Sequence, residues 1–147
     1  MAELGTDMSR FNGPDKLCKW AGVYPGNNES AGKRKSGKTP PGNKTLKSTL
    51  AQSAQAARKK KDSFFFAQYG RLVSHRGKNK ATMAVAHSML IAIYFVLSGN
   101  DFKDLGADYY NKFNREKKIN SHIKQLSKLG VVIPDDVLRD AILQKSA

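Results

Sequence analysis

Residues 81–97 read ATMAVAHSMLIAIYFVL, and this run decides the fold. It is the longest apolar run in the chain, but it is slightly short for a membrane span and is interrupted by Thr82, His87 and Ser88. A helix that is apolar on all sides belongs in the core of a protein. We therefore predict a buried core helix over residues 81–98, ended by Gly99-Asn100, and no membrane partner.

Apolar residues also recur at helical spacing on both sides of this run, and Asp62 or Ser63 is placed to cap the helix just before it. No segment alternates in the manner of a strand, and there is no internal repeat. The further predicted helices cover residues 14–21, 44–60, 63–76, 119–129 and 135–142, and residues 101–116 are predicted to hold a short helix around Tyr109, Tyr110 and Phe113. The predicted class is all-α, a small helical domain with a long basic Gly/Pro-rich loop between its early helices. We divide it into a domain over residues 1–100 and a helical extension over residues 101–147 that packs on it.

The charge of the chain is strongly basic and unevenly distributed. The 147 residues include 26 Lys and Arg against 12 Asp and Glu, a formal net charge of +14. Residues 1–80 hold 17 basic and 5 acidic residues, and therefore +12 of that total. Nucleic acid is the commonest polyanion that such clustering serves. The alternative, a basic protein with no dedicated partner, does not explain why the charge gathers in one half.

Residues 32–39, GKRKSGKT, fit the pattern G-x-x-x-x-G-K-[ST] of a phosphate-binding loop. Such a loop needs a buried strand before it and a helix that begins at its Lys-Thr. Residues 24–29 contain no apolar run, and Pro40 and Pro41 follow Thr39. We therefore interpret the match as accidental. A nucleotide hydrolase remains a third hypothesis, which predicts ATP binding that depends on Lys38.

What remains of this stretch is a cationic loop within the Gly- and Pro-rich residues 22–42. Its binding to phosphates should weaken steeply with salt. Ser30 and Ser36 lie among these charges, and surrounding cations would stabilise the charge that develops when a serine attacks a phosphodiester. By spacing alone, a serine in such a loop is usually structural. The candidate DNA contacts are Lys33, Arg34, Lys35, Lys38, Lys44, Lys47 and Arg58.

Other reactive side chains give weaker signals. Cys18 is the single cysteine, so no internal disulfide forms, and we expect it to fill a small core space. His87 is expected to be a core or helix-face residue rather than a catalytic base. The start, MAELGTDMSR, has no apolar stretch that would indicate a signal peptide, so we expect a cytoplasmic protein. The acids of the basic half are scattered and do not suggest a two-metal site.

A series of short motifs follows in order along residues 1–100. They are Arg10-Phe11, Ala21-Gly22-Val23-Tyr24-Pro25, Ser30-Ala31-Gly32-Lys33, Gly42-Asn43, Leu46-Lys47-Ser48-Thr49-Leu50, Ala56-Ala57, Tyr69-Gly70-Arg71-Leu72, Arg76-Gly77-Lys78 and Ala84-Val85-Ala86. The series resembles the C-terminal domain of the insertion-sequence 110 family of transposases, also called the 116/902 type. Residues 101–147 resemble that family only loosely. No single motif is specific, but the ordered series is.

This resemblance implies a role in DNA transposition, with the DNA of the mobile element and of its target as partners. Recombination requires several subunits to meet, so the resemblance also implies a homo-oligomer, and some members of the family use a guide RNA. The family's C-terminal domain supplies a serine that attacks DNA; by motif position this is Ser30, with Ser36 as the fallback. Two departures stand out. Lys47 replaces the usual Arg, and the family's Ser-Lys-x-Gly-Asn reads TPPGN over residues 39–43.

The family also carries an N-terminal domain in which four acidic residues bind magnesium. The sequence contains no such domain, and MAELG resembles the interior of a helix-hairpin-helix segment. We therefore expect a detached C-terminal part of a transposase, with no cofactor of its own and no transposition by itself. The alternative is a non-enzymatic basic helical module, a nucleic-acid-binding remnant or a regulator, in which Ser30 is idle.

Overall fold

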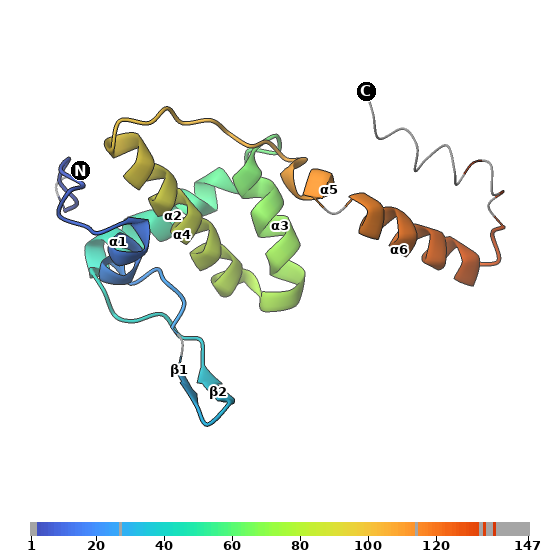
Figure 1. The fold of residues 1–147 in the computed structure, drawn as a ribbon, viewed down its shortest axis with the longest axis horizontal. Coiled ribbons are helices and arrows are strands. Elements are labelled where there is room, and N and C mark those ends of the chain that lie inside the picture. Colours follow the sequence, from blue (N-terminus) through green and yellow to red (C-terminus); the bar gives the residue numbers. More distant parts are fainter. Residues whose placement is uncertain (1–2, 27, 114, 133, 135–136, 138–147) are drawn as a thin grey trace. The chain divides into compact units, whose positions relative to one another are not determined.

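The long apolar run forms α4 (Lys78–Leu97), the central helix in a computed structural model of the chain. The structure describes residues 3–26, 28–113, 115–132, 134 and 137. The helices that contact α4 are α1 (Pro14–Ala21), α2 (Lys44–Ala57) and α3 (Phe64–Arg76) (Figure 1). The residues of α4 that they bury are Ala81, Thr82, Val85, Ala86 and Leu90. Helices supply this packing, and the predicted all-α class is confirmed.

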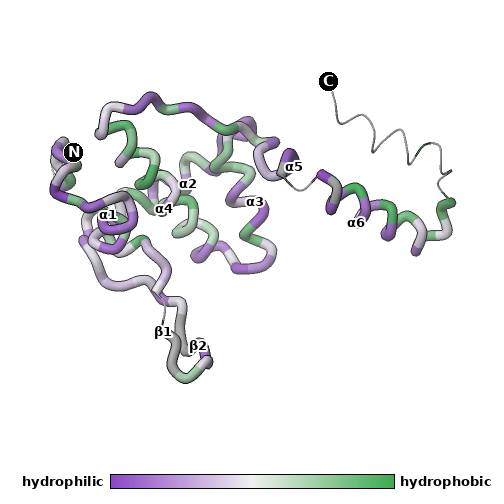
Figure 2. The backbone as a smooth tube through the Cα atoms, in the orientation of Figure 1, coloured by the Kyte–Doolittle hydropathy of each residue, from purple (hydrophilic) through white to green (hydrophobic). Residues whose placement is uncertain are grey.

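The hydropathy of α4 explains its place. Its residues are apolar along most of its length (Figure 2). By length and composition α4 is the one helix in the described part of the chain that could cross a membrane. It nevertheless packs against three other helices, as predicted for a core helix. Burying a side chain such as Val85 or Leu90, both 0 % exposed, stabilises the fold by roughly 1.5–3 kcal/mol.

The helix ends follow from local capping. The Asn43 side chain accepts a hydrogen bond from the backbone N–H of Leu46 at 2.9 Å and begins α2. Ser63, rather than Asp62, caps α3 by accepting from the N–H of Phe66 at 3.2 Å. The second helix is shorter than predicted, because it ends at Ala57 and residues 58–60 form a turn.

The Gly- and Pro-rich segment contains a structure that the sequence analysis did not predict. β1 (Asn28–Ser30) and β2 (Lys33–Ser36) form an antiparallel hairpin. Ala31 and Gly32 join the strands with φ values of 50° and 72°. Two consecutive positive φ values are characteristic of the tight turns that connect hairpin strands. The strands escaped prediction because their residues are nearly all polar, so no alternation of apolar and polar residues marks them.

The chain divides into two compact units, residues 1–107 and 108–147. The second unit contains α5 (Tyr109–Phe113) and α6 (Arg115–Lys128). Ile119 and Ile123 lie one helical turn apart on α6 and are half-buried. Figure 2 shows hydrophobic and hydrophilic residues alternating along α6. The predicted helix over residues 135–142 lies outside the described residues, apart from Val137. The predicted packing of the C-terminal extension on the first domain stays a prediction.

Candidate nucleic-acid interface

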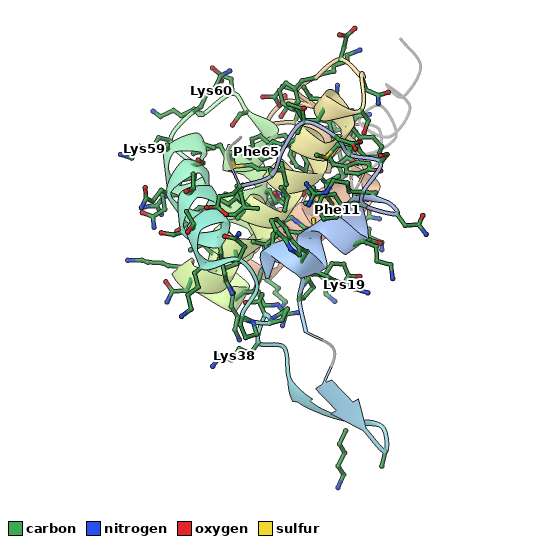
Figure 3. The ribbon with its side chains drawn as sticks, turned by 90° about the vertical axis from the view of Figure 1, so that its left-hand side faces the viewer. Phe11, Lys19, Lys38, Lys59, Lys60 and Phe65 are labelled. Atoms are coloured by element: carbon green, nitrogen blue, oxygen red, sulfur yellow. The ribbon has the colours of Figure 1, made fainter. Side chains whose placement is uncertain are left out.

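Ser30 is the last residue of β1, directly before the turn. The hairpin register pairs Ser30 with Lys33 and Glu29 with Arg34. A bulge follows, because Asn28 pairs with Ser36 and leaves Lys35 without a cross-strand partner. The candidate nucleophile and the first candidate phosphate contact are therefore neighbours across one hairpin. We call residues 28–38 the arm, which projects from the helices of its unit (Figures 1 and 3).

The base of the arm is a close approach of two backbone segments. Gly22 has a φ of 74°, and a Cβ there would lie 2.7 Å from the carbonyl oxygen of Pro41. A Cβ on Gly42, whose φ is 59°, would overlap the backbone of Gly22. A Cβ on Gly26 would overlap the carbonyl of Lys38. Only glycine permits this approach, so the segments that leave and re-enter the helical body are held side by side.

Lys47 lies at the base of the arm, and its ammonium already has hydrogen-bond partners within the chain. Its ammonium donates to the hydroxyl of Thr39 at 2.9 Å and to the carbonyl oxygen of Pro40 at 3.1 Å. Its side chain is half-buried. The sequence predicts that Lys47 contacts DNA phosphates, as the family's arginine would. The structure instead gives it partners within the chain, on the segment that returns from the arm.

Arg58 follows the other end of α2, and its guanidinium also interacts with a residue of the chain. Its guanidinium donates to the hydroxyl of Tyr69 and lies 4.8 Å from the centre of that ring. The 14 residues of α2 span about 21 Å, so Arg58 is far from Lys44 although both line one side of the helix. The predicted set of seven basic residues is therefore not a single cluster.

The remaining candidates gather at and near the arm. Lys33, Lys38 and Lys44 are exposed. Figure 3 shows Lys38 at the end of the helical body from which the arm extends. Arg34 and Lys35 belong to β2, next to Lys33. Five of the seven predicted contacts thus lie on the arm or at the first residue of α2.

The structure also reveals cations that the sequence analysis did not select. Lys59, Lys60 and Lys61 are exposed beyond the end of α2, and Figure 3 shows Lys59 and Lys60 at the opposite end of the body from Lys38. The run RKKK over residues 58–61 was the available signal. Lys19, on α1, has its ammonium 5.0 Å from the centre of the Tyr24 ring. No sequence pattern marks that contact, because it depends on the turn after α1.

The arm does not have the geometry of a nucleotide phosphate-binding loop. The residues of the matching pattern form the turn and second strand of a hairpin, and the next helix begins only at Lys44. A phosphate-binding loop instead leads directly into its helix. The match is therefore accidental, as the sequence analysis predicted.

Cys18 and His87 both belong to the packed interior. Cys18 is 0 % exposed, and burial raises the pKa of its thiol to about 11. Burial lowers the pKa of His87, whose ring packs edge-on against Tyr24 with centroids 5.6 Å apart. A thiol that is protonated at neutral pH is a poor nucleophile. Cys18 fills core space, as predicted.

Residues 1–69 match the model of the transposase family described as IS116/IS110/IS902. The match covers just under half of the chain, and this segment is therefore similar to the C-terminal domain of such a transposase. Comparisons with curated proteins and with solved structures find no match. The matched residues cover α1, the arm, α2 and the first turn and a half of α3. This similarity points to a role in DNA transposition, with DNA as the partner.

Metal ligation by the chain can be tested on its described side chains. Among the described residues, no three His, Cys, Asp or Glu side chains come together in a way that could hold a metal ion. Glu3 is engaged elsewhere, because its carboxylate accepts a hydrogen bond from the Asn43 amide at 2.8 Å. The family resemblance places the four-carboxylate magnesium site in a separate N-terminal domain, and we derive no step through a metal in the described residues.

Proposed function

We propose that this transposase domain binds the DNA of a mobile element through its arm, and that Ser30 is the nucleophile that attacks a DNA phosphodiester. The observation that carries the proposal is the pairing of Ser30 with Lys33 inside a cationic hairpin that belongs to a transposase domain. The proposed phosphate contacts are Lys33, Arg34, Lys35, Lys38 and Lys44.

The chemistry of the proposed step is a transesterification. A bond forms between the serine oxygen and phosphorus, and the bond from phosphorus to one deoxyribose oxygen breaks. The departing oxygen takes up a proton, and the serine proton passes to a base. A second deoxyribose hydroxyl can reverse the step on another strand, so the phosphodiester is conserved. Cations beside the serine would stabilise the negative charge that develops on the phosphate oxygens.

The glycine-lined base of the arm supports this function. A nucleophile must be held at an attack distance and angle, and a small displacement costs orders of magnitude in rate. The close backbone approach at Gly22 and Gly42 and the two hydrogen bonds of Lys47 restrain the arm where it joins the helices. A loop whose two ends were not held side by side would lose more conformational entropy when it became ordered around DNA.

DNA binding is tested first by its dependence on salt. Five phosphate contacts predict that log K falls with log salt with a slope of about −4.5, or roughly 500-fold between 50 and 200 mM salt. The double substitution Lys33→Gln and Lys38→Gln should reduce the slope by about 2. A control with the same net charge, Lys124→Gln and Lys128→Gln on α6, should leave the slope unchanged. Equal slopes for the two double variants would contradict the proposal.

The role of Ser30 is tested separately with Ser30→Ala. A labelled DNA strand is incubated with the chain and with the family's four-carboxylate domain added in trans, and covalent protein–DNA adducts are counted on a denaturing gel. Ser30→Ala should abolish the adduct and leave DNA binding intact, whereas Ser36→Ala should retain it. If the adduct survives Ser30→Ala and is lost in Ser36→Ala, the nucleophile is Ser36. If the unsubstituted chain binds DNA but forms no adduct, the alternative holds, and the domain is a non-enzymatic nucleic-acid-binding module.

A further inference from the structure

The single tryptophan of the chain lies on the surface at the end of α1. Trp20 is 40 % exposed, while Leu17, Cys18 and Ala21 of the same helix are fully buried. The Phe11 ring lies beside it, with ring centroids 5.7 Å apart and an angle of 56° between the planes. Phe11 itself is half-buried (Figure 3). The two rings therefore form an aromatic surface that is partly open to solvent.

Basic side chains surround this aromatic surface. The guanidinium of Arg10 lies 5.9 Å from the centre of the Phe11 ring. Lys16 and Lys19 are exposed and fall within about 100° of Trp20 around the helix axis, Lys16 one turn before it. The acid of α1, Asp15, falls on the far side of Lys19 from Trp20. An aromatic surface flanked by cations matches a nucleotide, which combines a flat apolar base with an anionic phosphate.

The location of Trp20 connects this surface with the arm. The carbonyl oxygen of Trp20 accepts a hydrogen bond from the N–H of Asn43 at 3.2 Å, and Asn43 directly follows the glycine-lined base. Gly22, two residues after Trp20, forms the other side of that base. Figure 3 shows Lys19 at the end of the body from which the arm extends. The aromatic surface and the arm therefore belong to the same end of the domain.

We propose that Trp20, with Phe11 beside it, stacks an unpaired nucleobase of single-stranded DNA, while Arg10, Lys16 and Lys19 contact the adjoining phosphates. In a duplex both faces of a base are covered by its neighbours, so the indole can stack only on a base that has left the helix. The site goes beyond the proposed function of the arm, and it does not need Ser30 to be catalytic.

Because Trp20 is the only tryptophan, its fluorescence reports this site alone. The full chain is titrated with a 12-nucleotide oligothymidine, with a deoxyribose-phosphate oligomer of the same length that lacks bases, and with a duplex. Stacking predicts that the oligothymidine quenches the emission and that the base-free oligomer and the duplex do not. Equal quenching by the base-free oligomer would overturn the proposal, because it would report charge alone.

Affinity measured by anisotropy of labelled oligomers gives the second test. Trp20→Ala should weaken binding of oligothymidine roughly 5- to 100-fold and leave binding of the base-free oligomer unchanged. Trp20→Phe keeps a stacking ring and should recover part of the loss, and it also controls for folding. Phe102→Ala removes an aromatic ring that is 57 % exposed elsewhere on the first unit and should have no effect. Equal losses for both oligomers, or none for either, would refute the stacking site.

The outcomes separate this proposal from the function of the arm. If Lys33→Gln with Lys38→Gln leaves the salt dependence of duplex binding unchanged while oligothymidine still quenches Trp20, the arm proposal fails and the stacking site stands. If the duplex slope changes as predicted but Trp20→Ala binds oligothymidine as the unsubstituted chain does, the stacking site fails and the arm proposal stands. In the second case the exposed indole serves another surface, such as a protein contact.

Discussion

Replacing Lys47 separates two roles that a lysine beside a cationic arm could have. The structure gives its ammonium two acceptors inside the chain, Thr39 at 2.9 Å and Pro40 at 3.1 Å. A lysine that holds the chain to itself does not release counterions from DNA, whereas a phosphate contact does. We therefore expect Lys47→Gln to destabilise the domain and to leave the salt slope of DNA binding near that of the unsubstituted chain.

The magnitude follows from the lost hydrogen bonds. Two bonds from a half-buried ammonium are worth together about 1–2 kcal/mol once water competes for the same groups. For a chain of this size that corresponds to a fall of roughly 2–8 °C in Tm. The matched substitution is Lys44→Gln, at an exposed position one turn earlier on α2, which should leave Tm unchanged and reduce the slope by about 0.9.

The assay pairs thermal unfolding with duplex binding at several salt concentrations. Hydrogen exchange of the amides in residues 28–38 adds a local measurement, because a loosened base should speed exchange in the arm. If Lys47→Gln reduces the salt slope as much as Lys44→Gln and leaves Tm and amide exchange unchanged, Lys47 contacts DNA and the reasoning from its internal partners is wrong.

Four further predictions concern positions with a defined physical constraint. Gly42→Ala should cost more than about 2 kcal/mol and lower Tm by several degrees, because the new methyl overlaps the backbone of Gly22 at a positive φ. Ala31→Gly should stabilise the hairpin by up to about 1 kcal/mol, measured as slower amide exchange in the arm, because alanine is strained at a φ of 50°. Cys18 should react with a thiol reagent at pH 8 only as fast as the chain unfolds, because its pKa is raised to about 11 and its side chain is buried. Burial lowers the pKa of His87 below its ordinary value of 6.5, so the unfolded chain binds the extra proton more readily. Unfolding midpoints should therefore fall as the pH drops below about 6.5, and His87→Gln should reduce this dependence; an unchanged dependence would refute the assignment.

The basic residues predicted to contact DNA fall into two groups, those on the arm and those that have partners within the chain. The basic residues of the arm were selected from composition and motif order, and they lie together on the hairpin and on the segment that returns from it to α2. Lys47 and Arg58 were selected in the same way, but the structure gives each of them a partner within the chain. The spacing of residues along α2 could not show which segments of the chain would fold against either side chain.

Features that depend on neighbouring residues could be predicted from the sequence. The apolar run of α4, a cap for α3 at Asp62 or Ser63 and the concentration of charge in the first half are local properties, and each was predicted. The cap of α2 at Asn43 is equally local but was not predicted. Local spacing fixes which face of a helix is apolar, and a capping side chain acts within three residues. The all-α class follows from these features alone.

Features that join distant residues could not be predicted from the sequence and appear only in the folded chain. Gly22 and Gly42 are twenty positions apart, and their need for glycine arises only because two backbone segments meet there. The exposure of Trp20 beside Phe11 depends on how the N-terminal segment folds over α1. The hairpin that carries Ser30 has no alternation of apolar and polar residues. Its conformation depends on the turn at Ala31 and Gly32 and on the glycine-lined base of the arm, which holds the ends of the hairpin together. Such contacts have no fixed spacing in sequence, so no periodicity records them, and packing alone brings the residues together.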